Sequence, residues 1–278
     1  MIVARTAVKT ISTRYKQALR RNLSSSVHLI QPTVGSFVAL EHPLNSDLIP
    51  HVGLCTLTFI QDGSVIHQDS SSEKEQLIEP EEVSWLVTGK GVVSAQHSST
   101  EEVDGWKLWI ALPKKYEKME PAYYHSPSIV EIPNPRFDTE VRLLVGKLWG
   151  REQRNIPLLP GMKDLFVLTV EFKTNSSFWT CPQAFPKDAQ VGIYVTSGKI
   201  QLNDDDTTVL ESGDLHVWNN TNDTDQKLLD LQGVLPDSRC IIFGGSELPE
   251  PRYLKGSLCS SDQNKLDHDE EFAFFQGF

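Results

Sequence analysis

Short alternating segments separated by tight turns dominate residues 49–113. In residues 54–60, LCTLTFI, successive side chains are expected to point to opposite faces of a strand. Asp62-Gly63 follows with hairpin-turn chemistry, because glycine adopts positive φ without steric cost. Gly89-Lys90-Gly91 separates two later apolar runs. The pattern predicts an antiparallel sheet that closes on itself.

The same pattern returns downstream. Residues 191–202 again read as strand, glycine turn and strand, with Gly198 at the turn. The segment ESGDLHVW at 211–218 then resembles EPEEVSW at 79–85. An internal repeat of this kind predicts an all-β chain of two tandem jelly-roll-like barrels.

Size and charge exclude several classes of protein. The 278 residues allow two domains, and the net charge of −11 argues against direct nucleic-acid binding. No apolar run approaches the roughly 20 residues of a membrane helix. The cysteines are widely spaced without a CxxC pair, so we expect reduced thiols and a cytoplasmic or nuclear protein. No G-x-S-x-G elbow, Walker A loop, H-E-x-x-H run or Rossmann glycine string is present.

The repeat and the loop-rich stretches between its copies divide the chain. We expect a basic segment at 1–31, a first barrel at 32–113, a connection at 114–140, a second barrel at 141–250 and a tail at 251–278. The connection is rich in proline and charge, which favours loops and turns over a helix. The aromatic end of the tail predicts a buried anchor.

The basic segment has two interpretations. Residues 1–31 carry Lys and Arg without any acid and are rich in Ser and Thr, which is typical of a mitochondrial transit peptide. Alternatively, residues 6–12 and 18–23 form the first strands of the first barrel. Both interpretations stay open from the sequence.

Several fragments resemble the pirins, a family of bicupin proteins. They include His67-Gln68-Asp69-Ser70, the run TGKGVV at 88–93, GWKLWIALP at 105–113 and FGGSELPEP at 243–251. The resemblance is strongest in the first barrel. It implies two tandem cupin barrels with a short C-terminal tail that packs back on the first.

The resemblance also implies a metal site that this sequence does not reproduce. Pirins hold iron or another transition metal with two His of a His-Pro-His run and the His and Glu of a His-x-Glu run. Here the runs read Ile49-Pro50-His51 and Ser94-Ala95-Gln96. Isoleucine cannot coordinate a metal, and serine and glutamine are weak neutral ligands. The inherited pocket at Ile49, His51, Ser94 and Gln96 therefore reads as a degenerate metal site, with His51 as its remnant.

Two other histidines could rebuild the site. His97 follows Gln96, but strand alternation places the two side chains on opposite faces, so His97 could serve as a ligand only if the strand bulges. His67 belongs to the pirin-like string after the glycine turn, where the simpler interpretation is a histidine that bonds neighbouring backbone.

In the second barrel neither His216 nor the Asp204-Asp205-Asp206 turn shows ligand spacing, which predicts a metal-free barrel.

Two functional hypotheses follow. The first is a pirin-like pseudoenzyme, a non-catalytic binding or scaffold protein that needs no cofactor and acts through an unidentified protein partner, with no membrane association. The second is a metal-dependent dioxygenase, because some pirins oxidise the flavonol quercetin. It would use Fe(II) or another transition metal in a site rebuilt from His51 and His97 or His67.

Overall fold

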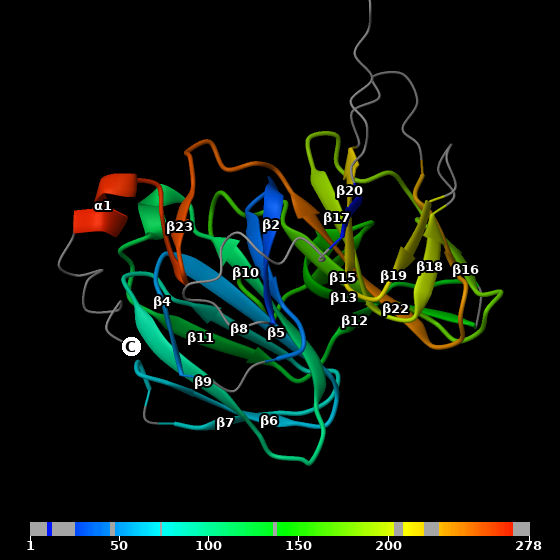
Figure 1. Ribbon diagram of the computed structural model, residues 1–278, viewed down its shortest axis with the longest axis horizontal. Coiled ribbons are helices and arrows are strands. Elements are labelled where there is room, and N and C mark those ends of the chain that lie inside the picture. The colour runs from blue at the N-terminus through cyan, green and yellow to red at the C-terminus, as the bar shows by residue number, and fades with distance from the viewer. Residues whose placement is uncertain are drawn as a thin grey trace, which may run out of the picture. The chain divides into compact units, whose positions relative to one another are not determined.

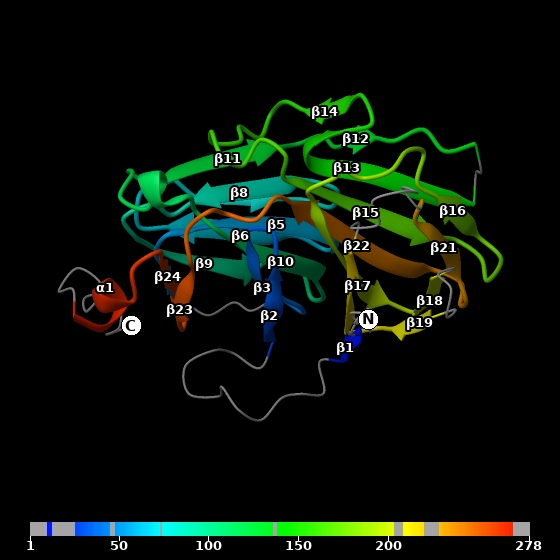
Figure 2. The same cartoon turned by 90° about the horizontal axis from the view of Figure 1, so that it is seen from above.

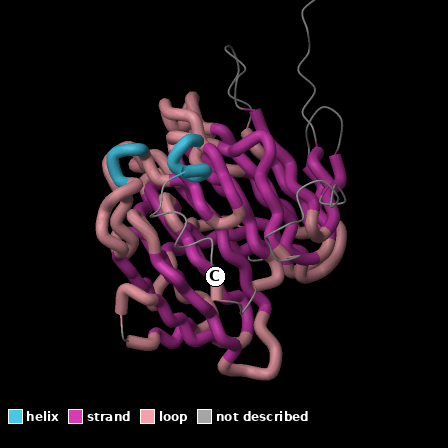
Figure 3. Tube along the Cα trace, turned by 60° about the vertical axis from the view of Figure 1, so that its left-hand side comes forward, coloured by secondary structure: helices cyan, strands magenta, loops and turns pink. Residues whose placement is uncertain are grey.

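The computed structural model describes residues 10–12, 26–44, 48–72, 74–135, 138–202, 208–219 and 228–268. Within these residues nearly all regular structure is strand, as Figure 3 shows. The chain forms two compact units, one built from 1–18, 130–153 and 163–247 and the other from 19–129, 154–162 and 248–278. The units interleave along the chain, whereas the sequence predicted contiguous blocks.

The first barrel consists of two antiparallel sheets (Figure 1). The larger sheet has the strand order β11 (Ala122–Ser126), β8 (Val83–Val87), β5 (Leu54–Asp62), β10 (Asp104–Ala111), β3 (Phe37–Glu41) and β2 (Val27–Val34). The smaller sheet has the order β4 (Ile49–His51), β9 (Val92–Ser98), β6 (Val65–Asp69) and β7 (Gln76–Ile78). A short 3-10 turn, η1 (Lys114–Tyr116), follows β10.

The second barrel repeats this arrangement. One sheet has the order β1 (Thr10–Ser12), β20 (Asp214–Asn219), β17 (Gln190–Ser197), β22 (Ser238–Gly245), β15 (Phe166–Phe172), β13 (Thr139–Leu148) and β12 (Val130–Glu131), with β14 (Arg151–Gln153) beside β13. The other has the order β16 (Phe178–Thr180), β21 (Asp230–Gly233), β18 (Lys199–Leu202) and β19 (Thr208–Glu211). The expected all-β fold of two barrels is confirmed.

The internal repeat is visible in the strand pairing itself. Strand β5 pairs with β8 and β10, as β17 pairs with β20 and β22. Strand β6 pairs with β7 and β9, as β18 pairs with β19 and β21. The two similar sequence segments, 79–85 and 211–218, lead into β8 and β20, and these two strands occupy corresponding positions in their sheets.

The N-terminal strand differs from its expected place. Residues 10–12 pair with β20 of the second barrel, in register from Thr10 opposite His216 to Ser12 opposite Asp214. We expected residues 6–12 in the first barrel. The free edge of β20 offers unpaired backbone groups, and an extended segment satisfies them. Residues 18–23 lie outside the described part, and the transit-peptide interpretation stays a prediction.

Strand alternation sets the two faces of the large sheet in the first barrel. Trp106 and Trp109 lie on opposite faces of β10, as their odd spacing predicts, and both are buried. Trp106 packs on Phe59 at 5.5 Å between ring centroids, while Trp109 packs on His51 at 4.9 Å. The face that carries Trp109 therefore looks toward the smaller sheet.

Apolar residues along the strands of the second barrel are buried on both faces of its larger sheet and in its smaller sheet. They include Val141, Leu143, Val145, Leu165, Val167, Leu168, Val170, Ile193, Val195, Ile200, Leu202, Ile241 and Phe243. The triple acid at 204–206 lies outside the described residues.

The C-terminal tail packs on the first barrel, as expected. It forms the hairpin β23 (Tyr253–Lys255) and β24 (Leu258–Ser260) and the helix α1 (Gln263–His268), shown in orange and red in Figure 2. The Cys259 N–H donates to the Val52 carbonyl at 2.9 Å, and the Ser257 hydroxyl donates to the Pro50 carbonyl. A Cβ on Gly53, at φ +68°, would collide with the Cys259 carbonyl, so the hairpin requires glycine there. The tail thereby holds β4 in place. The aromatic residues after 268 lie outside the described part.

The 114–140 connection is partly strand. It contributes β11 to the first barrel and β12 to the second. Among the described residues, no helix is long and apolar enough to cross a membrane.

Candidate functional site

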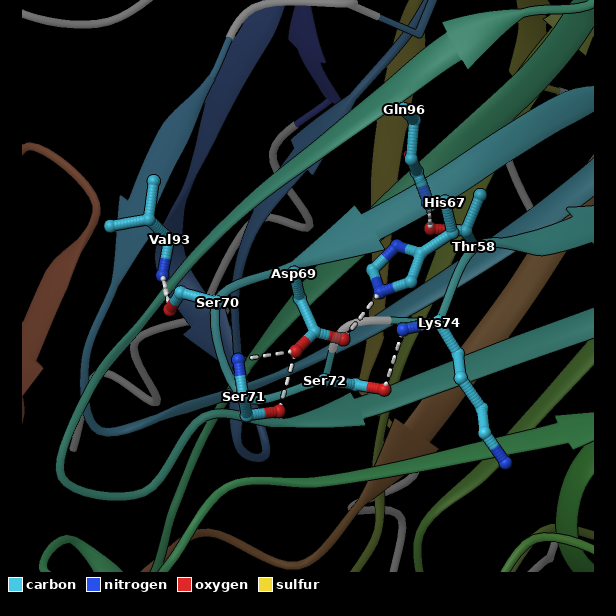
Figure 4. Close-up of polar contacts among 9 residues, drawn as sticks. All are labelled: Thr58, His67, Asp69, Ser70, Ser71, Ser72, Lys74, Val93 and Gln96. Atoms are coloured by element: carbon cyan, nitrogen blue, oxygen red, sulfur yellow. Dashed lines mark hydrogen bonds and ion pairs between the residues drawn. The ribbon is translucent and has the colours of Figure 1, made fainter.

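The inner face of the first barrel is defined by contacts between its two sheets. The Gln96 amide nitrogen on β9 donates to the Thr58 hydroxyl on β5 at 2.8 Å (Figure 4). The His67 ring on β6 stacks on Tyr123 of β11, with centroids 4.5 Å apart and planes 14° from parallel. Together with the contact between His51 and Trp109, these pairs show which side chains point into the barrel.

The four residues of the inherited pocket lie on adjacent strands. Ile49 and Ser94 are Cα partners in the β4–β9 ladder, and His51 lies opposite Val92 in the same ladder. Gln96 lies two residues beyond Ser94 and therefore on the same face of β9. The structure thus brings the predicted set together, although Ile49 supplies only hydrocarbon.

His51 is fully buried and uncharged at neutral pH. Its pKa is lowered to about 3, mainly by burial and then by the electrostatic effects of the nearby Lys107 and His67. Neither ring nitrogen has a hydrogen-bond partner among the described residues. His51 is therefore held by ring packing on Trp109 instead of by a polar contact.

His97 lies away from this face. It pairs with Ile66, is exposed, and belongs to a β6–β9 register that runs unbroken from Val65 opposite Ser98 to Asp69 opposite Ser94. Without a bulge in this register, alternation keeps the His97 side chain on the outer face. The structure therefore does not bring His97 to the inherited pocket.

His67 is part of a buried pair that the sequence interpretation missed. Its Nε2 lies 3.0 Å from Oδ2 of Asp69, and the Asp69 carboxylate also accepts from the Ser71 backbone N–H at 2.8 Å and from the Ser71 hydroxyl (Figure 4). Burial alone would raise the pKa of Asp69, but the hydrogen bonds from His67 and Ser71 outweigh it and lower that pKa. The His-x-Asp spacing was the available signal, because residues two apart share a strand face.

A buried ion pair completes the polar inner face. Lys107 on β10 lies opposite both Glu41 on β3 and Thr58 on β5, and its Nζ is 3.7 Å from Oε2 of Glu41. The Lys107 and Glu41 side chains are 7% and 0% exposed. Sequence reasoning overlooked them, although a lysine inside the apolar run WKLWIALP was a visible signal.

These residues do not fit a transition metal. Among the described residues, no group of three His, Cys, Asp or Glu side chains is placed to hold one. The inherited pocket offers one imidazole and the Gln96 amide oxygen, because the Gln96 nitrogen already donates to Thr58. A functional iron site needs three anchored ligands, including a charged one. His216, on β20, also belongs to no such group.

Comparison with known proteins agrees with this architecture. Residues 26–110 match the family profile for pirin. A pirin-like protein of Caulobacter vibrioides is 24% identical over 252 residues, which cover 84% of this chain and 81% of that protein. The crystal structure of a quercetin 2,3-dioxygenase from Acinetobacter baumannii matches with a TM-score of 0.72 at 20% identity, covering 97% of this chain and 87% of that one.

A bacterial pirin from Escherichia coli, YhhW, solved in complex with nickel(II), matches with a TM-score of 0.58 at 13% identity. It covers 87% of this chain and 100% of that structure. These structural likenesses show the fold. The family profile falls on the first barrel and the Caulobacter relative spans both barrels, so the comparisons support a place for this chain among pirin-like proteins.

Proposed function

We propose that this chain is a pirin-like binding protein that has lost the family's metal site and performs no metal-dependent oxidation. The observation that carries the proposal is the Ile49–Ser94 pair in the β4–β9 ladder. The resemblance to pirins puts metal-binding imidazoles at both positions. Here they supply a hydrocarbon and a neutral hydroxyl.

The charges around the inherited pocket also disfavour the binding of a divalent metal ion. In the metal-binding pattern a glutamate occupies the position of Gln96, and its charge offsets that of the metal. Here the amide is neutral and its nitrogen is bonded to Thr58. The Lys107 ammonium is close enough to lower the pKa of His51. The same positive charge disfavours a cation bound to His51.

The metal content of the purified full chain tests the proposal. Plasma mass spectrometry, before and after anaerobic incubation with Fe(II) or Ni(II), should find far less than one metal per chain. The matched control is the triple variant Ile49→His, Ser94→His and Gln96→Glu, which restores both ligand runs and should bind close to one metal per chain. Near-stoichiometric metal in the natural chain, lost in His51→Ala, would contradict the proposal.

Metal-dependent dioxygenase activity is the second candidate. It is favoured by the fold of the Acinetobacter dioxygenase and by the position of His67 on the same inner face as His51. Oxygen uptake with quercetin, measured after metal loading, decides between the two candidates. Turnover by the natural chain that exceeds that of the His51→Ala variant would favour the enzyme, and turnover confined to the triple variant would favour the binding protein.

The non-catalytic role also implies a partner, which we propose to be another protein. The support is indirect: without a metal, function rests on what the barrel interior or the surface binds.

A further inference from the structure

The C-terminal tail is attached to β4 by a contact much smaller than a strand ladder. Val52, just after β4, forms an isolated parallel bridge with Leu258 of β24. The carbonyls of Pro50 and Val52 accept hydrogen bonds from the Ser257 hydroxyl and the Cys259 N–H. Proline has no N–H, so this edge of β4 lacks a donor at residue 50 and cannot extend a regular ladder to the tail.

The tail has internal contacts that hold it together. Strands β23 and β24 pair with each other along their whole length, and α1 contacts both, as Figure 2 shows. The Lys255 ammonium donates to the Leu266 carbonyl at 3.2 Å, which ties the hairpin to the helix. Leu258 and Leu266 form with Val52 a small buried cluster of their own. A segment with mostly local contacts opens as one unit at a lower free-energy cost than the central strands of a core.

Glu117, in the loop after η1, anchors the end of the hairpin. Its carboxylate accepts from the Ser261 N–H at 2.7 Å and from the Ser260 hydroxyl at 3.4 Å, and Glu117 is 7% exposed. In the part of the chain that the structure describes, no Lys or Arg forms an ion pair with it. A buried carboxylate loses hydration that these hydrogen bonds replace only in part. Undocking the tail returns the carboxylate to water, which lowers the cost of opening.

Strand β4 depends on the tail for one of its two sides. Its other side pairs with β9 from Ile49 to His51. Cys259 of the tail belongs to the same buried cluster as Trp109, on which His51 packs. Without the tail, β4 would be an edge strand of three residues held on one side, and His51 would lose part of the packing behind Trp109.

We infer that the tail is a releasable latch for β4. Docked, it holds β4 and the His51 ring as they lie in this structure. Undocked, it frees residues 49–52 together with the tail and opens that edge of the first barrel. The latch therefore controls whether the β4 side of the inherited pocket is formed. This goes beyond the proposed function, because it applies whether or not the pocket holds a metal.

Alkylation of cysteines in the folded, full-length chain tests the latch. All four cysteines are buried, each at most 1% exposed. Burial raises the pKa of the Cys259 thiol to about 12, so this thiol reacts when the tail opens and not while it is docked. Iodoacetamide in native buffer, read by mass spectrometry, should modify Cys259 at least about tenfold faster than Cys55, Cys181 or Cys240, which lie in the barrels.

Hydrogen exchange resolved by peptide tests the coupling to β4. In the natural chain, peptides that cover 49–53 and 253–262 should exchange at matching rates, and a peptide of the central strand β5 should exchange more slowly. Glu117→Ala removes the acceptor of the Ser261 N–H and should speed exchange of the first two peptides about tenfold. Glu120→Ala, the matched control, removes an exposed carboxylate that pairs with Lys90 and should leave both rates unchanged.

Two results would overturn the inference: alkylation of Cys259 no faster than that of Cys55, or unequal exchange of the 49–53 and 253–262 peptides. Both are read from the natural chain, so they stand even if Glu117→Ala fails to fold. A folded Glu117→Ala variant in which exchange rises in the tail but not in 49–53 would equally contradict the coupling.

Discussion

The two barrels share one pattern of strand pairing and differ in what fills them. Across the large sheet of the first barrel, the paired residues on the inner face are Glu41, Lys107, Thr58 and Ser84. Counted from the turn glycines, the corresponding residues of the second barrel are Leu168, Ile242, Ile193 and His216. At three of these four positions the first barrel has a polar residue and the second barrel has an apolar one.

This difference separates fold from function. Backbone pairing satisfies the same hydrogen bonds in both barrels, so the ladder does not require a polar interior. The apolar interior of the second barrel stabilises the fold by removing hydrocarbon from water. The first barrel forgoes part of that stabilisation to bury an ion pair, two histidines and an amide. Because polar groups are retained at such a cost, we propose that the first barrel carries the function.

The largest expected effect comes from breaking the ion pair. Lys107→Ile installs the second-barrel residue type but leaves Glu41 buried opposite it, and it should lower the free energy of unfolding by about 3–5 kcal/mol. Urea denaturation, with hydrogen exchange resolved by peptide to separate the barrels, measures the loss.

The double variant Lys107→Ile with Glu41→Leu is the control. It reproduces the apolar pair of the second barrel and should recover most of the loss, because no unpaired charge remains. If the single variant were as stable as the natural chain, the Lys107–Glu41 pair would make no contribution to the free energy of unfolding.

The reciprocal exchange between the barrels should be asymmetric. Leu231→Gln, at the ladder position that corresponds to Gln96, buries an amide among the apolar residues of the second barrel and should cost about 2–3 kcal/mol. Gln96→Leu removes an amide whose oxygen is unpaired, and it should be close to neutral in stability. Urea midpoints of the two variants compare these effects directly. Equal losses would mean that the two interiors are equally tolerant of the exchange.

Stability should fall on acidification through His51. Its pKa is about 3 in the folded chain against 6.5 for an ordinary histidine, so between these values the unfolded chain binds more protons. The free energy of unfolding should therefore decrease as pH falls below 6.5, approaching about 1.4 kcal/mol per pH unit. Urea midpoints at pH 7 and at about pH 5 measure the slope. His51→Leu should be less sensitive to pH in this range, and an unchanged slope would place the dependence elsewhere.

The smallest expected effect tests the role of Thr58 as the hydrogen-bond acceptor of the Gln96 amide. Thr58→Val keeps the shape but removes the acceptor of the Gln96 amide, and it should cost about 1 kcal/mol. Thr56→Val, one step along the same face of β5, is the matched control and should cost less. Thermal denaturation of the two variants measures the difference, and equal losses would show that the Gln96 contact is not what matters.

The sequence predicted the fold well and the site in part. The alternation of apolar residues and the glycine turns identified the strands, because both are local properties of the chain. The similarity of residues 211–218 to residues 79–85 identified the second barrel. The inherited pocket came from family resemblance, and the structure brings its four residues together on β4 and β9. The predicted position of residues 10–12 in the first barrel was wrong. These residues pair with the open edge of β20 in the second barrel, because an extended segment can satisfy the backbone groups of such an edge.

The sequence by itself predicted the repeat of two barrels, and its resemblance to pirins predicted that Ile49, Ser94 and Gln96 stand where the family has metal ligands. Only the tertiary structure decided that His67 stacks on Tyr123, that Lys107 meets Glu41, and that His97 points outward. Periodicity states which residues share a face of one strand. Which faces enclose an interior depends on how sheets distant in sequence pack together, and that packing places a set of unpaired hydrogen-bonding groups inside the first barrel.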